Sequence, residues 1–243
     1  MKIKVFITLF LFLAAFSLAA SHEETIEKTF KLDKNGEFAL KNINGTIMIR
    51  THSKNEARVK AVKTAKKKEE LAYIKVKFDF SDNHLKVYTK REKSHSSVKV
   101  NFEVWLPENL AESSIKTVNG EVQMEGKFGS LDTSTVNGKI HLEGSIGDAE
   151  FQTVNGSIGV YCKTKLNGDI EAQTVNGSVK IEFSKNSDFN FDAHTLNGSI
   201  SSDFSEVYIK KGFIGKSAKG EIGKSDHQVS VETVNGSIKI LGN

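Results

Sequence analysis

The chain has 243 residues, with 34 Lys and Arg against 30 Asp and Glu and a single cysteine. This length supports one or two domains with an apolar core, and one cysteine excludes an intrachain disulfide. The net charge of +4 is modest and few aromatic residues lie among the basic ones, which excludes a typical nucleic-acid-binding protein.

The first twenty residues have the layout of a secretory signal peptide. Met1-Lys-Ile-Lys4 is a short basic start, and Val5 to Ala20 is an uncharged apolar run that ends in small residues. The run is shorter than a typical membrane-spanning helix. The sequence therefore predicts an exported protein that is periplasmic, at the cell surface or secreted, with no membrane span after cleavage. An uncleaved anchor is the alternative.

Residues 21–110 alternate apolar and polar side chains, which is typical of strands. Lys and Arg are in excess here, most densely from Lys60 to Lys68, which suits a solvated face or contact with an anionic surface. We expect this part to be a β-rich cap module that covers the open end of a repeat region, residues 111–243. One helical turn is expected within 66–72, and strands are expected at 25–32, 46–50, 57–62, 74–80, 84–88 and 98–105.

The motif Thr-Val-Asn-Gly recurs through residues 111–243. Its first glycines are spaced by 18, 18 and 21 residues, and a second set, Gly129, Gly147 and Gly168, lies nine residues before the next repeat glycine. Asn42-Ile-Asn-Gly45 echoes the motif, and Ser217-Ala-Lys-Gly220 is interpreted as a degraded copy. Each repeat thus has two corners. The Asn-Gly corner residues are Asn119, Gly120, Asn137, Gly138, Asn155, Gly156, Asn176, Gly177, Asn197, Gly198, Asn235 and Gly236.

The residues on both sides of each Asn-Gly alternate with period two and therefore indicate strands. Asn-Gly between strands is also a strong hairpin signal. A repeat with two corners that recurs in one direction is better explained by coils stacked in parallel than by a series of hairpins. The predicted fold is all-β: a β-solenoid with rungs of about 18–22 residues and an N-terminal β-rich cap.

Parallel stacking makes predictions about the motif's own side chains. Stacked Asn residues should form an amide ladder and stacked Thr residues a second ladder, while Gly and Asn should supply the positive φ of a tight corner. The Val of each copy either tucks inward at the corner or forms an exposed apolar stripe where a partner could dock. The motif is interpreted first as a folding device.

Outward positions of the predicted strands include a row of carboxylates. Four consecutive rungs should place Asp132, Glu150, Glu171 and Asp192 above one another, a candidate binding face. Nearby lysines and water, or a cation such as Ca²⁺ or a basic partner, would relieve their repulsion. No other cofactor is expected, because the His residues are scattered and no metal-binding, phosphate-loop or hydrolase motif occurs. Cys162 shares strand parity with Val160 and should be a buried thiol.

The order of three segments resembles the bacterial putative-adhesin family, an exported β-repeat family of unknown function. These segments are Val104-Trp-Leu-Pro107, then Ile115-Lys-Thr-Val-Asn-Gly-Glu-Val122, then repeated Thr-Val-Asn-Gly-Ser-Ile. The resemblance implies a surface or periplasmic protein and supplies no catalytic residues. We predict a non-enzymatic binding, adhesion or scaffold protein of the cell envelope whose partner is a glycan, an anionic lipid or a protein. A carbohydrate-active enzyme that uses surface carboxylates of a parallel β-helix is the alternative.

Overall fold

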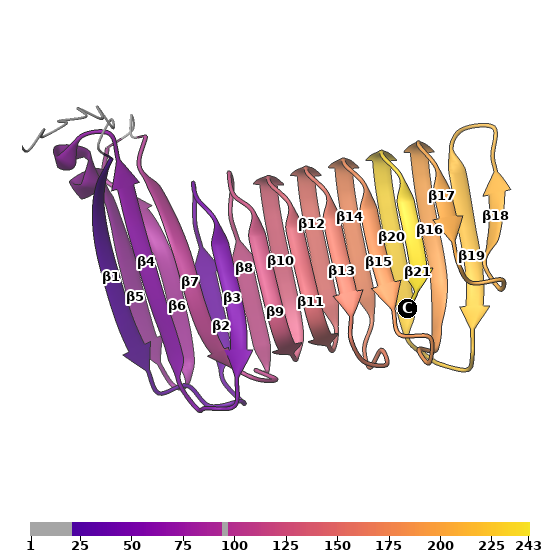
Figure 1. The fold of residues 1–243 in the computed structure, drawn as a ribbon, viewed down its shortest axis with the longest axis horizontal. Coiled ribbons are helices and arrows are strands. Elements are labelled where there is room, and N and C mark those ends of the chain that lie inside the picture. The colour runs from indigo at the N-terminus through magenta and orange to yellow at the C-terminus, as the bar shows by residue number, and fades with distance from the viewer. Residues whose placement is uncertain (1–20, 94–96) are drawn as a thin grey trace, which may run out of the picture.

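The computed structural model describes residues 21–93 and 97–243. The predicted signal peptide, residues 1–20, lies outside the described residues. The described chain forms two sheets that lie face to face along one long axis (Figure 1). This arrangement confirms the predicted β-solenoid.

The first sheet, sheet A, has ten strands and the second, sheet B, has eleven. Sheet A contains, in spatial order, β1 (His22–Phe30), β4 (Ala57–Ala65), β7 (Lys99–Pro107), β3 (Ile47–His52), β9 (Val122–Phe128), β11 (Ile140–Ile146), β13 (Ile158–Cys162), β15 (Val179–Phe183), β21 (Ile238–Gly242) and β17 (Ile200–Ser202). Sheet B contains β18 (Tyr208–Lys211), β19 (Lys216–Ile222), β16 (Phe189–Asn197), β20 (Gln228–Asn235), β14 (Ile170–Asn176), β12 (Ala149–Asn155), β10 (Ser130–Asn137), β8 (Glu112–Lys116), β2 (Glu37–Lys41), β6 (His84–Arg91) and β5 (Ile74–Ser81).

Each rung of the repeat crosses from sheet B to sheet A at an Asn-Gly corner and returns at a second corner. In one rung β10 leads through Asn137-Gly138 into β11, and Gly147 then returns the chain to β12. Equivalent strands pair in parallel, as β10 does with β12 and β11 with β13. Alternate side chains point between the sheets, where one buried cluster runs from Leu32 to Ile240. Burial of this shared apolar layer is what holds each rung against its neighbours.

The last repeat in the sequence is not the last rung in space. The β20–β21 rung lies between the β14–β15 rung and the β16–β17 rung, and it pairs in parallel with both (Figure 1). The expected degraded copy at Ser217–Gly220 is wrong, because these residues belong to β19, which pairs antiparallel with β16. The chain leaves the solenoid after β17, forms the β18–β19 hairpin at its end, and returns to insert one further rung.

Close stacking, and not positive φ, explains the repeat glycines. Among the motif's copies only Gly45 has a positive φ, so the expected reason for glycine is wrong at the Thr-Val-Asn-Gly corners. A Cβ at Gly156 would instead lie well inside the van der Waals distance of the Gly138 carbonyl oxygen, and Gly138 stands in the same relation to Gly120. Backbone approaches this close exclude every side chain.

The N-terminal part supplies strands to both sheets. The expected strands are present, and the expected helical turn is a 3₁₀ helix, Lys68–Tyr73. Strand β2 was missed by the sequence analysis because its apolar alternation is only Phe38-Ala-Leu40. Parallel pairing with β6 and β8 holds it in place. The chain of β2, Asn44-Gly45 and β3 forms a further rung in register with β8 and β9.

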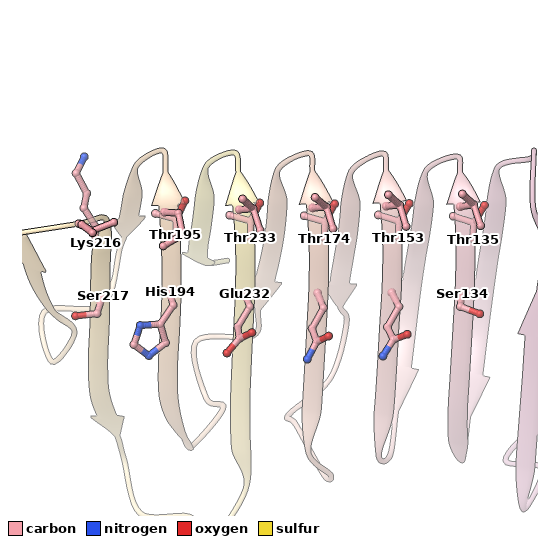
Figure 2. A pocket seen from close by; sticks show the side chains of 18 of the residues that line it. Ser134, Thr135, Thr153, Thr174, His194, Thr195, Lys216, Ser217, Glu232 and Thr233 are labelled. Carbon is pink, nitrogen blue, oxygen red and sulfur yellow. The ribbon is translucent and has the colours of Figure 1, made fainter. Parts of the chain in front are cut away.

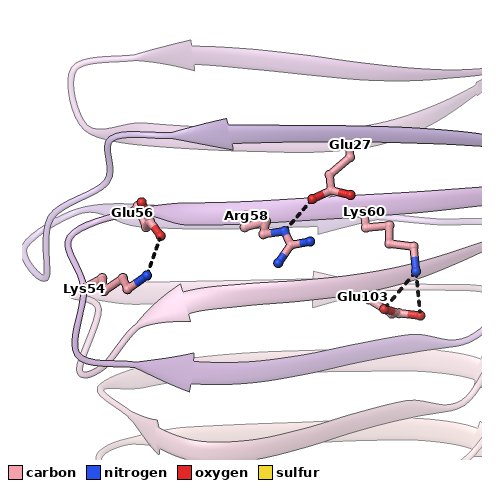
Figure 3. Close-up of polar contacts among 6 residues, drawn as sticks. All are labelled: Glu27, Lys54, Glu56, Arg58, Lys60 and Glu103. Atoms are coloured by element: carbon pink, nitrogen blue, oxygen red, sulfur yellow. Dashed lines mark hydrogen bonds and ion pairs between the residues drawn. The ribbon is translucent and has the colours of Figure 1, made fainter.

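Cross-strand ion pairs hold the basic residues of β4, including the first two lysines of the predicted basic run. Lys60 contacts Glu103 at 3.3 Å and Arg58 pairs with Glu27, both on the outer face of sheet A (Figure 3). The Lys63 side chain is buried and its ammonium lies 2.8 Å from Glu24. Opposite charges on paired strands stabilise the sheet modestly. Two of the five lysines in the run are thus ion-paired on β4, and the other three, Lys66, Lys67 and Lys68, are exposed to solvent.

The stacked glycines generate a direct test. We expect Gly156→Ala to lower the free energy of unfolding by about 1–3 kcal/mol, the usual range for overpacking a close contact. Gly159→Ala in the same rung is the matched control, because its Cβ meets side chains and no backbone: the Tyr161 ring at 3.2 Å and His141 Nδ1 at 3.6 Å. Its effect should stay within about 0.5 kcal/mol. Urea denaturation of the chain from residue 21 measures both, and equal effects would contradict the stacking argument.

Candidate functional site

The Asn-Gly corners form a continuous ladder of side-chain amides. Each Asn Nδ2 donates to the Oδ1 of the Asn on the neighbouring rung, at 2.8–3.0 Å. The ladder lies at the surface, where these bonds fix the register of successive corners. In spatial order its members are Asn44, Asn119, Asn137, Asn155, Asn176, Asn235 and Asn197.

The threonines of the motif point inward and thereby turn the valines outward. Thr153 Oγ1 donates to the carbonyl of Gly138 at 3.1 Å, and Thr174 Oγ1 donates to that of Gly156 at 3.0 Å. Because successive strand residues face opposite sides, Val154 and Val175 face solvent and are each 40% exposed. Of the two orientations left open by the sequence, the outward one is therefore observed, and the inward alternative is wrong. The residues at this position are here called the valine stripe: the exposed Val118, Val136, Val154, Val175 and Leu196, and the half-buried Val234.

Beside the valine stripe runs a second row of side chains, two residues earlier in each strand. Ser134, Gln152 and Gln173 occupy neighbouring strands, followed by Glu232 and His194 (Figure 2). We call these residues, with Lys116, the polar row. Apart from Val118 and Lys116, the stripe and the polar row line a shallow groove of about 770 Å³ on the outer face of sheet B, and Ile214 and Lys216 of the β18–β19 hairpin lie at one end of it. The groove is long, follows the solenoid axis and is largely uncharged.

The predicted row of four carboxylates is interrupted. Because the β20–β21 rung is inserted, Ser230 stands between Glu171 and Asp192, and the expectation of four consecutive rungs is wrong. Asp132, Glu150 and Glu171 remain on adjacent strands. Together with Asp192 these residues are called the acidic row.

Local partners contact each member of the acidic row. Asp132 pairs with Lys116 at 2.7 Å, and this hydrogen bond raises the pKa of Lys116 above its usual value. Asp192 lies 2.7 Å from Lys219. The amides of Gln152 and Gln173 donate to Glu150 and Glu171. Lysine and amide contacts thus offset much of the repulsion. Within residues 21–93 and 97–243, no group of three or more His, Cys, Asp or Glu has the arrangement of a metal site.

Cys162 ends strand β13 with its side chain between the sheets. It is 2% exposed, and burial raises the pKa of its thiol to about 12. The prediction of a buried thiol is confirmed. A thiol with so little thiolate and no access to solvent is a small apolar core residue.

The apolar end of the groove was not predicted from the sequence. Phe213 and Ile214 form the tip of the β18–β19 hairpin, and both are strongly exposed. The available signal was the run Lys211-Gly-Phe-Ile-Gly-Lys216, in which glycines bracket two apolar residues and lysines flank the glycines.

The fold is an all-β solenoid that presents a long, regular surface. Its rungs stack in parallel, each rung has two corners, and the valine stripe faces outward. Residues 75–241 match the family model described as Toastrack DUF4097, and the chain therefore belongs to that family. No curated protein matches the chain. Among the described residues, no helix has the length and apolar character needed to cross a membrane.

Three solved bacterial structures are similar to the chain. A "putative cell adhesion protein" from Clostridium sporogenes is 13% identical with a TM-score of 0.44, covering 90% of this chain and 100% of its own. A "putative adhesin" from Bacteroides fragilis is 14% identical with a TM-score of 0.47, covering 90% and 97%. A further "putative adhesin" from Parabacteroides merdae is 14% identical with a TM-score of 0.34, covering 90% and 96%.

Replacing a carboxylate of the acidic row by the corresponding amide should change the free energy of unfolding in opposite directions at two positions. We expect Glu171→Gln to raise the free energy of unfolding by a few tenths of a kcal/mol, since it removes a like charge beside Glu150. Asp132→Asn should lower it by a similar amount, because Lys116 loses its partner. Thermal unfolding at low salt measures both, and both effects should shrink in about 1 M NaCl, where charges are screened. Stabilisation by both variants, or by neither, would contradict these pairings.

Burial of Cys162 predicts a protected thiol. With a pKa of about 12, roughly one thiol in ten thousand is ionised at pH 8, and that one is shielded from reagent. We expect labelling by a disulfide reagent at pH 8 to be slower by orders of magnitude in the folded protein than in about 6 M guanidinium chloride. Fast labelling of the folded protein would show that β13 opens readily.

Proposed function

We propose that this protein is exported and acts without catalysis as a binding or scaffold protein of the bacterial cell envelope, holding its partner along the groove on sheet B. The observation that carries the proposal is the valine stripe, whose apolar side chains stay exposed beside a largely neutral polar row. Contiguous exposed apolar surface on a folded protein commonly marks an interaction site.

The shape of the groove suits an elongated partner. Neighbouring strands of a sheet are about 4.8 Å apart, so the valine stripe repeats one apolar contact at that interval along the axis. Membership in a family built from stacked repeats supports the same role, because solenoids present extended surfaces to their partners. A glycan strand, an extended peptide or another protein surface would each meet this regular array.

The groove's chemistry supports binding over catalysis. Five of the six threonines that line it donate their hydroxyls to backbone carbonyls. The sixth, Thr117, has no hydrogen-bond partner among the described residues but is buried, so none is an exposed nucleophile. The carboxylates Glu150 and Glu171 accept amide hydrogen bonds, and Asp132 is ion-paired. Export is supported by the signal-like residues 1–20.

Cell fractionation and envelope binding test the proposal. We expect the mature protein to begin near Ser21 and to fractionate with the envelope. The purified chain from residue 21 should sediment with isolated envelope material of the producing bacterium. Val154→Asp combined with Val175→Asp should abolish sedimentation and leave the melting temperature nearly unchanged, because both side chains are exposed.

The matched control adds the same charge to the opposite face. Gln123→Asp combined with Ser201→Asp lies on the outer face of sheet A and should bind as the wild type does. Loss of sedimentation in both double variants would point to a general charge effect. A protein found only in the cytoplasm, or unaltered binding by the groove variant, would refute the proposal.

A further inference from the structure

The β18–β19 hairpin holds large apolar side chains out in solvent. Its loop is a tight turn in which Gly212 N donates to Gly215 O at 3.1 Å, and Gly215 has a φ of +76°. Phe213 at the tip is 105% exposed, Ile214 is 74% exposed and Tyr208 is 78% exposed. No described residue covers the tip. A fully exposed Phe beside an exposed Ile contributes nothing to folding, so its place in the sequence requires another explanation.

The same hairpin is locally basic in an acidic part of the chain. Between residues 208 and 219 there are four lysines and no Asp or Glu, although residues 111–243 as a whole have an excess of acidic residues. Lys219 pairs with Asp192. Within the described part of the chain, Lys210, Lys211 and Lys216 form no ion pair. Three free cations thus surround an apolar tip.

The hairpin also projects beyond the sandwich. Sheet A ends at β17, whereas sheet B continues past β16 with β19 and β18 (Figure 1). The turn lies at the same end of the sheet B strands as the Asn-Gly corners, and in Figure 2 Lys216 points away from the strands beyond that end. The tip can therefore meet a flat surface before the body of the molecule does.

We propose that the Phe213-Ile214 tip inserts into the interfacial region of an anionic lipid membrane, with Lys210, Lys211 and Lys216 at the level of the phosphates. Apolar side chains buried at the acyl boundary together with lysines facing anionic headgroups are the chemistry of interfacial anchors. Tyr208, on the adjacent strand, is the kind of amphipathic ring that settles at the membrane interface. Ile214 and Lys216 also line the end of the groove, but the proposal uses only the hairpin and does not rest on the proposed function.

The charge pattern favours a membrane over a second copy of the chain. Strand β18 is the outer edge of sheet B, and an exposed edge can pair with another chain. Lysines on an edge strand oppose such pairing, and β18 carries Lys210 and Lys211 at adjacent positions. Two copies brought together at this edge would set these lysines against each other.

Vesicle sedimentation of the chain from residue 21 tests the proposal. We expect binding to vesicles of phosphatidylglycerol and phosphatidylcholine in equal parts, and at least tenfold weaker binding to phosphatidylcholine alone, since each lysine near an anionic surface contributes about a fivefold factor. Phe213→Ser combined with Ile214→Ser should weaken binding to the anionic vesicles by at least about tenfold. Lys210→Glu combined with Lys211→Glu should weaken it similarly, most strongly at low salt.

Two control variants separate the tip from other surfaces. Val154→Ser alters an exposed apolar residue of the groove on β12, with three strands between it and β19, and Lys66→Glu combined with Lys67→Glu alters exposed lysines at the other end of the molecule. Both should bind as the wild type does. Phe213→Trp should keep binding, and its emission, after subtraction of the wild-type signal from Trp105, should shift to the blue on addition of anionic vesicles.

Several results would overturn the proposal. These are no binding of the wild type to anionic vesicles, unchanged binding by the Phe213→Ser, Ile214→Ser variant, or equal loss in the Val154→Ser control. A concentration-dependent dimer in the absence of lipid, abolished by the tip variant, would assign the tip to a contact between copies. The melting temperature of the tip variant should match that of the wild type, because Phe213 touches nothing that folding requires.

Discussion

The structure depends on the distance between successive Asn-Gly corners. At each corner the glycine backbone lies against the carbonyl of the glycine one rung away, so closely that no Cβ fits. That approach brings the Asn amides within hydrogen-bond distance of each other and lets the Thr hydroxyls reach the glycine carbonyls. One motif thereby satisfies the polar groups of a corner that would otherwise be half-buried and unpaired. A rung of any other sequence would have to supply the same partners by separate means.

This corner also determines what the surface looks like. Because the Thr side chain turns inward to reach a carbonyl, the residue after it must face solvent, whatever its chemistry. Five of the six copies 117–120, 135–138, 153–156, 174–177, 195–198 and 233–236 place Val there and one places Leu. A polar residue would satisfy the fold equally well at an exposed position. Folding thus requires an outward-facing residue at this position but does not require it to be apolar. The apolar stripe therefore needs a reason other than folding, and this supports a binding role for the groove.

Much of this fold could be predicted from period and parity alone. The two corners per repeat, the parallel stacking and the burial of Cys162 all follow from glycine spacing and strand alternation. The spatial order of the rungs could not be predicted. The Thr-Val-Asn-Gly copies are nearly identical, so the motif does not specify which copy stacks on which. The insertion of β20–β21 between β14–β15 and β16–β17 separates Glu171 from Asp192. The orientation of Val154 was also undetermined, since it depends on where the chain bends within the corner.

Because the final rung is inserted, the hairpin β18–β19 forms the exposed end of sheet B. A solenoid whose last rung ended the chain would expose a full, flat edge to any other chain. Here the final rung is enclosed on both sides, and the exposed end is made by an antiparallel hairpin with a four-residue outer strand. Lysines on that strand protect the edge from pairing. Because the protecting strand needs only its backbone contacts with β19, its turn is free to carry side chains that the fold does not use, and Phe213 and Ile214 occupy that turn. Protection of the edge and presentation of an apolar, basic tip are therefore compatible in one short segment.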